Sequence, residues 1–199
     1  MQSLATLLAP WGALRPQLPS DWEGPPDALP DEVAAFYRDV GPWGEVVYEN
    51  VGPVGLTINK GGNPVVVPPL HKLWWRQAGF AWSRSPEVPL PGWRSNWLVI
   101  AKEEANPFIF DRDDGRVLFA FAGMGKAGWQ PRTFAEDLAS ALGGIATVAN
   151  ALAALGDDAF DEEFNLKPDS RDYAHSRLTD FLGSAAGASE MLAVWEWYE

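Results

Sequence analysis

Three short apolar runs in the centre of the chain constrain its fold more than any other feature. They occupy residues 97–101, 108–111 and 117–121. An Asn106-Pro107 turn separates the first two, and the sequence Asp-Asp-Gly at 113–115 separates the second from the third. Apolar runs joined by an Asp-Gly turn are a strong β-hairpin signal. We therefore expect antiparallel strands here, with Trp97 in the core.

A long helix is expected after these strands. Thr133 and Glu136 have the spacing of a capping box, which predicts that the helix begins at Thr133. The uncharged run at 138–156 continues it, with a bend or break expected at 143–144 and a stop at Gly156. This run is rich in Ala and Gly and includes polar residues, which favours a buried or amphipathic helix over a membrane span.

The remaining elements are weaker predictions. Val33, Phe36, Tyr37 and Val40 recur at helical spacing, so a helix is expected from Pro30 to Val40. We also expect a short helix within 1–14, strands at 46–48, 55–58 and 65–67, an irregular aromatic loop at 70–92, a helix at 173–182, a small-residue linker at 183–187, and an edge strand or aromatic clamp at 195–198.

The chain is strongly acidic, with 27 Asp and Glu against 15 Lys and Arg and a formal charge of −12. Such a surface repels nucleic acid and anionic membranes, so neither is expected as a partner. It attracts a basic protein and accelerates the encounter with it. The alternative is that the acidity only keeps a cytoplasmic protein soluble.

The residue types present exclude several kinds of chemistry. The chain has no cysteine, which excludes disulfides, thiolate metal sites and cysteine catalysis. Two histidines leave little material for a histidine-rich metal site, and no cofactor is expected. The first eight residues lack the charged and apolar regions of a secretory signal, so a cytoplasmic location is expected.

Three motifs resemble functional sites only superficially. Residues 123–128 match GxGxxG, but the expected helix starts too late for a dinucleotide phosphate to meet its N-terminus. Residues 111–115 resemble a calcium loop, but glycine falls at the fifth position and the twelfth is Ala122. Asp172 and His175 lie on one helical face without a nucleophile-elbow serine. The first two are expected to be a flexible loop and a hairpin turn, and no catalysis is expected from Asp172 and His175.

Four tryptophans between residues 74 and 93 are candidate contacts for a partner or a ligand. Tryptophan supplies rigid contact area and is enriched in interface hot spots. The alternative is that these side chains pack the loop against itself. The candidates are Trp74, Trp75, Trp82 and Trp93.

An acidic cluster near residue 160 is the second candidate site. A solvated acidic face, an electrostatic contact for a basic partner, and a metal site are all compatible with it. Carboxylates act as catalytic acids or bases only when one is desolvated, and nothing in the sequence indicates that here. The cluster consists of Asp157, Asp158, Asp161, Glu162 and Glu163.

Several sequence segments resemble the SUKH superfamily, which includes bacterial toxin-immunity proteins and a fungal regulator of cell-wall synthesis. Residues 29–41 look like its opening leucine-proline, helix, aromatic and glycine pattern, and 97–101 like its central strand. Its hairpin and closing helix are matched by 107–111 with 115–117, and by 133–138. The resemblance spans about 29–142. The chain departs from it at 41–44, at 70–92 and beyond Gly156.

The resemblance implies an α+β fold, with a mixed or antiparallel sheet of about 4–6 strands flanked by helices. Residues 1–156 would form this domain, and 157–199 a helical C-terminal extension packed on it. It also implies non-catalytic protein binding, because many members neutralise a toxin that is often a nuclease. A nuclease presents a basic surface, which an acidic protein can block.

Three functions therefore compete. The first is a non-enzymatic immunity protein that binds and neutralises a basic toxin domain. The second is a scaffold or regulatory interaction protein without a toxin partner. The third is a small-ligand binder or cryptic enzyme, which would need a convergent pocket with a perturbed carboxylate or His175.

Overall fold

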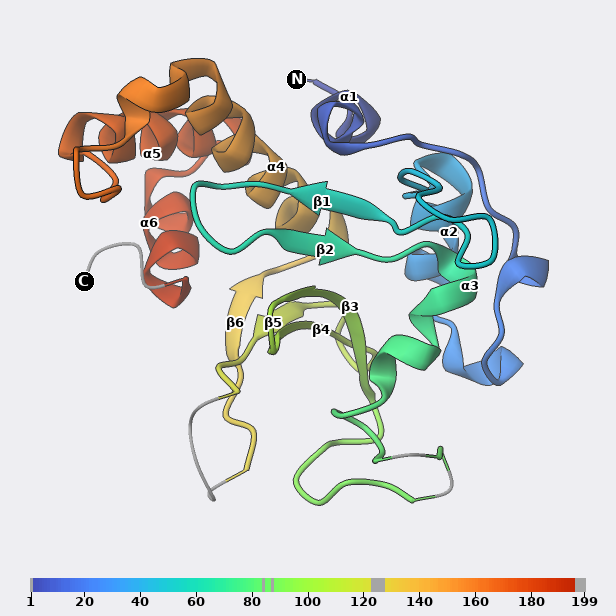
Figure 1. Cartoon of the computed structure of the whole chain (residues 1–199). Coiled ribbons are helices and arrows are strands. Elements are labelled where there is room, and N and C mark those ends of the chain that lie inside the picture. The colour runs from blue at the N-terminus through green and yellow to red at the C-terminus, as the bar shows by residue number, and fades with distance from the viewer. Residues whose placement is uncertain (1, 84, 87, 123–127, 196–199) are drawn as a thin grey trace.

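The computed structural model describes residues 2–83, 85–86, 88–122 and 128–195. Its centre is a six-stranded antiparallel sheet in which each strand pairs with the next one along the chain (Figure 1). This confirms the expected α+β class and the antiparallel alternative. The strands are β1 (Leu56–Ile58), β2 (Val65–Val67), β3 (Trp97–Glu103), β4 (Asn106–Asp111), β5 (Val117–Phe119) and β6 (Arg132–Ala135).

Six α-helices surround this sheet in the described residues, with α4, α5 and α6 gathered at one side and α2 and α3 at the other (Figure 1). The α-helices are α1 (Leu4–Leu8), α2 (Asp31–Asp39), α3 (Leu70–Leu73), α4 (Leu138–Leu155), α5 (Pro168–Leu182) and α6 (Ala185–Val194). Short 3-10 helices are η1 (Ala9–Trp11), η2 (Pro19–Asp21), η3 (Pro26–Ala28), η4 (Trp75–Gln77) and η6 (Gly156–Ala159).

The main hydrophobic core lies between the sheet and the helices. The predicted face of α2 is buried, because Val33, Phe36, Tyr37 and Val40 all belong to this core. Leu178 of α5, Leu192 of α6 and Trp195 belong to the same cluster, so the C-terminal helices and the sheet share one core. Packing of these helices therefore contributes directly to the stability of the sheet.

A smaller cluster covers the other face of the sheet. Trp97, Ile109 and Ala120 are buried there, and Trp93 and Trp129 pack against them. The burial of Trp97 confirms its predicted place in the core. On this face, tryptophans from connecting segments occupy the place that a helix takes on the other, which accounts for part of the high tryptophan content.

The predicted helix start at Thr133 is wrong. Thr133 lies in β6, and α4 begins at Leu138 after the N-cap Asp137, whose carboxylate accepts a hydrogen bond from the Ser140 backbone N–H at 2.6 Å. The Glu32 carboxylate of α2 also accepts from the Leu138 N–H at 3.1 Å. Pairing with β5 extends the backbone at 132–135, and this tertiary interaction overrides the local capping pattern.

Of the bend or break predicted at Gly143-Gly144, the break is wrong, because α4 is continuous. A Cβ on Gly144 would come within 2.7 Å of the Met191 sulfur and 3.3 Å of a Leu178 methyl group. The glycines therefore let α5 and α6 approach α4 closely. The predicted linker at 183–187 is likewise mostly helical, since Ser184 caps α6 by accepting from the Gly187 N–H.

The apolar composition of α4 follows from this burial. Together with η6, it forms a helical stretch, Leu138–Ala159, that is long and apolar enough to cross a membrane. Yet 67% of its most apolar window is buried inside the protein. A helix buried in a protein core can be as apolar as a membrane-spanning helix. The burial of α4 confirms the predicted buried helix.

We expect Gly144→Val to lower the free energy of unfolding by about 2 kcal/mol, because the branched side chain overpacks the α4–α5–α6 junction. Thermal and urea unfolding measure the change. Ala153→Val, at an exposed position of the same helix, is the matched control and should cost only a few tenths of a kcal/mol through helix propensity. Equal losses in the two variants would show that close helix packing does not explain the glycine.

Three other segments differ from expectation. Residues 46–48 form only an isolated bridge between Val46 and Pro53 instead of a regular strand. The 70–92 segment contains α3 and η4, so it is more regular than predicted. Trp195 follows α6 and packs into the core as a clamp, while the rest of the predicted 195–198 element lies outside the described residues.

Candidate functional site

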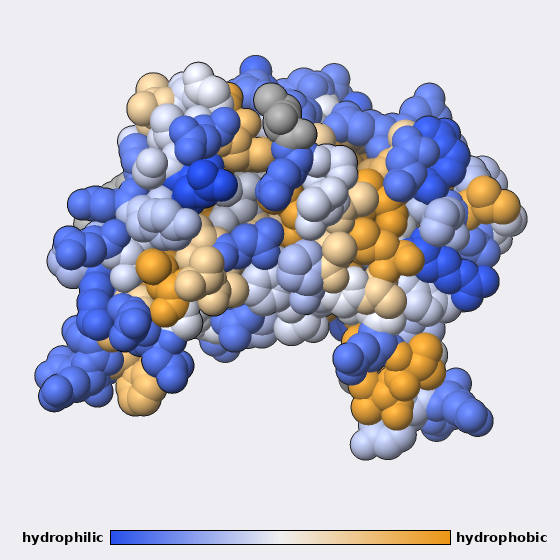
Figure 2. Space-filling view, turned by 90° about the horizontal axis from the view of Figure 1, so that it is seen from above, coloured by the Kyte–Doolittle hydropathy of each residue, from blue (hydrophilic) through white to orange (hydrophobic). Residues whose placement is uncertain are grey.

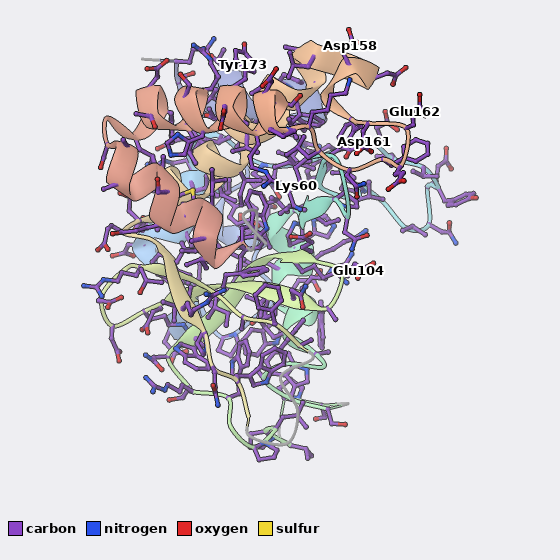
Figure 3. The ribbon with its side chains drawn as sticks, turned by 90° about the vertical axis from the view of Figure 1, so that its left-hand side faces the viewer. Lys60, Glu104, Asp158, Asp161, Glu162 and Tyr173 are labelled. Carbon is purple, nitrogen blue, oxygen red and sulfur yellow. The ribbon has the colours of Figure 1, made fainter. Side chains whose placement is uncertain are left out.

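Two lobes project from one side of the molecule with a hollow between them, and one lobe carries a compact group of hydrophobic residues (Figure 2). Two loops extend in this direction. We call residues 45–52 the apolar loop and residues 157–166 the acidic loop. Figure 3 shows both reaching the same edge of the molecule, the acidic loop marked by its labels Asp161 and Glu162. Projecting loops on one face are well placed to contact a partner together.

The apolar loop exposes an unusual amount of hydrophobic surface. Val46, Val47, Tyr48 and Val51 are between 48% and 66% exposed. The Lys72 ammonium holds the base of the loop by donating to the carbonyls of Val51 and Pro53 at 2.7 and 2.8 Å. Contiguous exposed hydrophobic side chains mark interaction surfaces.

The acidic loop is a closed turn that presents one aromatic side chain. Its ends are joined by a bridge between Phe160 and Leu166. Inside it, the Asp161 carboxylate accepts from the backbone N–H groups of Asn165 at 2.8 Å and Glu163 at 2.9 Å. Phe164, at the tip, is 87% exposed and has a left-handed backbone with φ of 63°.

Hydrogen bonding also stabilises the charge of Asp161. The hydrogen bond from the backbone N–H of Asn165 is the main cause that lowers the pKa of the Asp161 carboxyl, and desolvation opposes it. The carboxylate that closes the loop therefore persists to lower pH than an ordinary aspartate, and its contribution is lost only when the pH falls through the lowered pKa.

The predicted acidic residues lie together, and all are exposed. All five belong to the acidic loop, and Asp157 and Asp158 lie in its first part, which is the end of η6. Asp158, Asp161 and Glu162 occupy one corner of the molecule in Figure 3, with Glu104 of the β3–β4 turn below them. Within the described residues, no group of three or more His, Asp or Glu side chains is arranged to hold a metal ion.

The four predicted tryptophans separate into different environments. Trp82 is buried, and its ring centroid lies 4.5 Å from that of half-buried Trp74. Half-buried Trp93 packs edge-on against Trp97 at 5.4 Å. Trp75 is exposed, and its indole N–H donates to Glu23. The structure therefore brings Trp74 and Trp82 together but turns Trp75 away from them.

The other motifs are used differently from their functional counterparts. The Asp111 carboxylate accepts from the side chains of Asn96 at 2.7 Å and Trp97 at 3.3 Å, which ties the hairpin to the start of β3. His175 shares a hydrogen bond of 2.9 Å with Ser189, joining α5 to α6. The glycine motif falls largely on 123–127, outside the described residues.

The sequence patterns alone do not single out Phe164, although it directly follows the predicted acidic cluster. The available signal was its position between Glu163 and Asn165, because an aromatic residue in such a polar run is hard to bury. Comparison of the chain with protein-family models, curated proteins and solved structures gives no significant match in any of the three.

Proposed function

We propose that this protein is a non-catalytic binding domain that captures and neutralises a basic protein, with a nuclease-type toxin domain as the partner. The observation that carries the proposal is the acidic loop, which holds Phe164 almost fully exposed among carboxylates. The toxin as partner rests on the resemblance to immunity proteins of the SUKH superfamily.

The two loops supply the two kinds of interaction that such a partner needs. Nucleases carry basic surfaces because they bind phosphate. The carboxylates of the acidic loop steer such a surface into contact, and Phe164 then fills an apolar pocket as an anchor. The apolar loop adds hydrophobic contact area on the same side of the molecule.

The hydrogen bonds of Asp161 hold the acidic loop in one conformation before a partner binds. A side chain that is already held in its binding geometry loses little conformational entropy on association. The left-handed backbone at Phe164 is unfavourable for an aromatic residue and is maintained by the surrounding hydrogen bonds. Conformational strain at an exposed aromatic tip is consistent with a role in recognition.

We expect Phe164→Ala to weaken binding roughly 30-fold, or by about 2 kcal/mol, without lowering the unfolding temperature. Sequencing the DNA beside this gene identifies the toxin domain that we expect there as the test partner. Biolayer interferometry then measures the rates of binding. Tyr173→Ala is the matched control, because Tyr173 is an exposed aromatic residue on α5 and should leave binding unchanged.

Charge reversal in the same assay distinguishes the electrostatic effect of the carboxylates on association from the contact made by Phe164. The triple variant D157K/D158K/E162K should slow association about tenfold at low salt and lose this effect at high salt. Asp161 is left intact because it shapes the loop. Wild-type binding by both the triple variant and Phe164→Ala would remove the acidic loop from the interface. Binding that depends on the apolar loop alone would instead favour the scaffold function.

A further inference from the structure

A tryptophan-lined cavity lies at the other end of the molecule from the acidic loop. It has a volume of about 210 Å³, and its walls include Trp74, Trp82, Trp93 and Trp97. The segments that form it lie at the lower right of Figure 1, whereas the acidic loop lies at the upper left. The cavity is large enough for one aromatic ring with a short substituent.

Two arginines give this aromatic cavity a positive charge. Arg94 and Arg112 both line it, and the Arg94 guanidinium lies 5.1 Å from the Trp97 ring centroid in a cation–π contact. Within the described part of the chain, neither arginine forms an ion pair with a carboxylate. This arrangement stands out because acidic residues greatly outnumber basic ones in this protein.

The burial of Arg112 is incompletely compensated. Its side-chain Nε is buried without a hydrogen-bond partner in the structure. Desolvation is the main influence on the guanidinium and lowers its pKa, and the negative charge of Asp27 opposes this. Arg112 as a whole is half-buried, and enclosing one of its donors without an acceptor is unfavourable. An anionic ligand in the cavity would give the guanidinium group as a whole a charged partner.

We propose that this cavity binds a small aromatic carboxylate, with the ring between the tryptophans and the carboxylate on Arg112 and Arg94. Aromatic walls suit the faces and edges of a ring, and a guanidinium suits a carboxylate through paired N–H donors. The same chemistry is offered by a free aryl acid and by a peptide that ends in phenylalanine. This site is independent of the acidic loop and of the proposed function.

Isothermal titration with phenylacetate and with its neutral analogue phenylacetamide tests the proposal. We expect the carboxylate to bind at least tenfold more tightly than the amide, because only the carboxylate satisfies the arginines. N-acetylphenylalanine forms a second arm: tighter binding than phenylacetate supports the proposal with a peptide C-terminus as the source, and weaker binding supports it with a free acid.

Variants assign the effect to the arginines. Arg112→Met should abolish the preference for the carboxylate without reducing thermal stability, whereas a purely structural arginine would destabilise the protein when removed. Arg94→Met, at an exposed position, tests the same charge effect with less risk to folding. Arg177→Met on α5 is the control and should change nothing in either titration.

Equal affinity for phenylacetate and phenylacetamide would overturn the proposal, as would the absence of binding by both. Full retention of the preference in both Arg112→Met and Arg94→Met would overturn it as well. Because the readout is binding of a small molecule, these results are independent of whether the acidic loop captures a protein.

Discussion

Glu103→Ala should lower the free energy of unfolding by about 3–5 kcal/mol, the cost of breaking a buried ion pair from one side. Glu103 is buried at the end of β3, where its carboxylate lies 2.8 Å from the Lys60 ammonium. It also accepts from the Trp195 indole N–H at 2.7 Å. The Lys60 ammonium in turn lies 4.7 Å from the Trp195 ring centroid.

The size of this effect follows from what the substitution leaves behind. Alanine removes the acceptor of a cation whose side chain is only 9% exposed and of a buried indole N–H. The substitution also weakens the contacts of Trp195, which follows α6, with β3 and with the β1–β2 hairpin. Urea unfolding monitored by circular dichroism measures the loss.

Two further variants make this prediction specific. Asp39→Asn removes an exposed ion pair with Arg38 and should leave stability nearly unchanged, because water and salt screen such a pair. The double variant K60M/E103Q removes both charges but keeps an acceptor for Trp195, so it should recover most of the stability lost in Glu103→Ala. A double variant as unstable as Glu103→Ala would locate the effect in packing instead of charge.

Gln77→Met should cost about 3 kcal/mol, although it nearly preserves the side-chain volume. Gln77 is fully buried, and its amide replaces a neighbouring strand along one side of β3. Its oxygen accepts from the Val99 N–H and its nitrogen donates to the Val99 carbonyl, both at 2.8 Å. Methionine leaves both backbone groups buried without partners, at roughly 1–3 kcal/mol each.

The Gln77 amide can reach Val99 because β2 pairs only with the far end of β3. The β2–β3 register pairs Val65 with Glu103 and Val66 with Lys102, and it stops there. Gln130→Met, at an exposed position, is the matched control and should be nearly neutral. Hydrogen exchange at the Val99 amide gives a local readout, since faster exchange is expected in Gln77→Met. Unchanged stability and exchange would mean that the backbone finds other partners.

Much of the fold could be predicted from local sequence. The runs that became β3, β4 and β5 alternate with strong turn signals, and the face of α2 shows helical spacing. These signals depend only on residues close in sequence, so they can be recognised without knowledge of the tertiary contacts. The acidic cluster was equally visible, because charged residues close in sequence remain close on a surface.

Other features were decided by distant contacts. Thr133 has a capping pattern but lies in a strand, because its backbone pairs with Leu118 of β5. The two glycines of α4 weaken a helix locally, yet they stay helical because α5 and α6 pack over them. The exposure of Phe164 and the convergence of Arg94 and Arg112 on one cavity also depend on the tertiary structure.

The amino-acid sequence by itself determined the strand and helix pattern, the acidic surface and the absence of cysteine chemistry, because each of these follows from residue type and short-range spacing. Only the tertiary structure decided which apolar residues were buried and which arginines had no acid partner. Burial and charge pairing are properties of segments far apart in the chain, and no local pattern encodes where those segments meet.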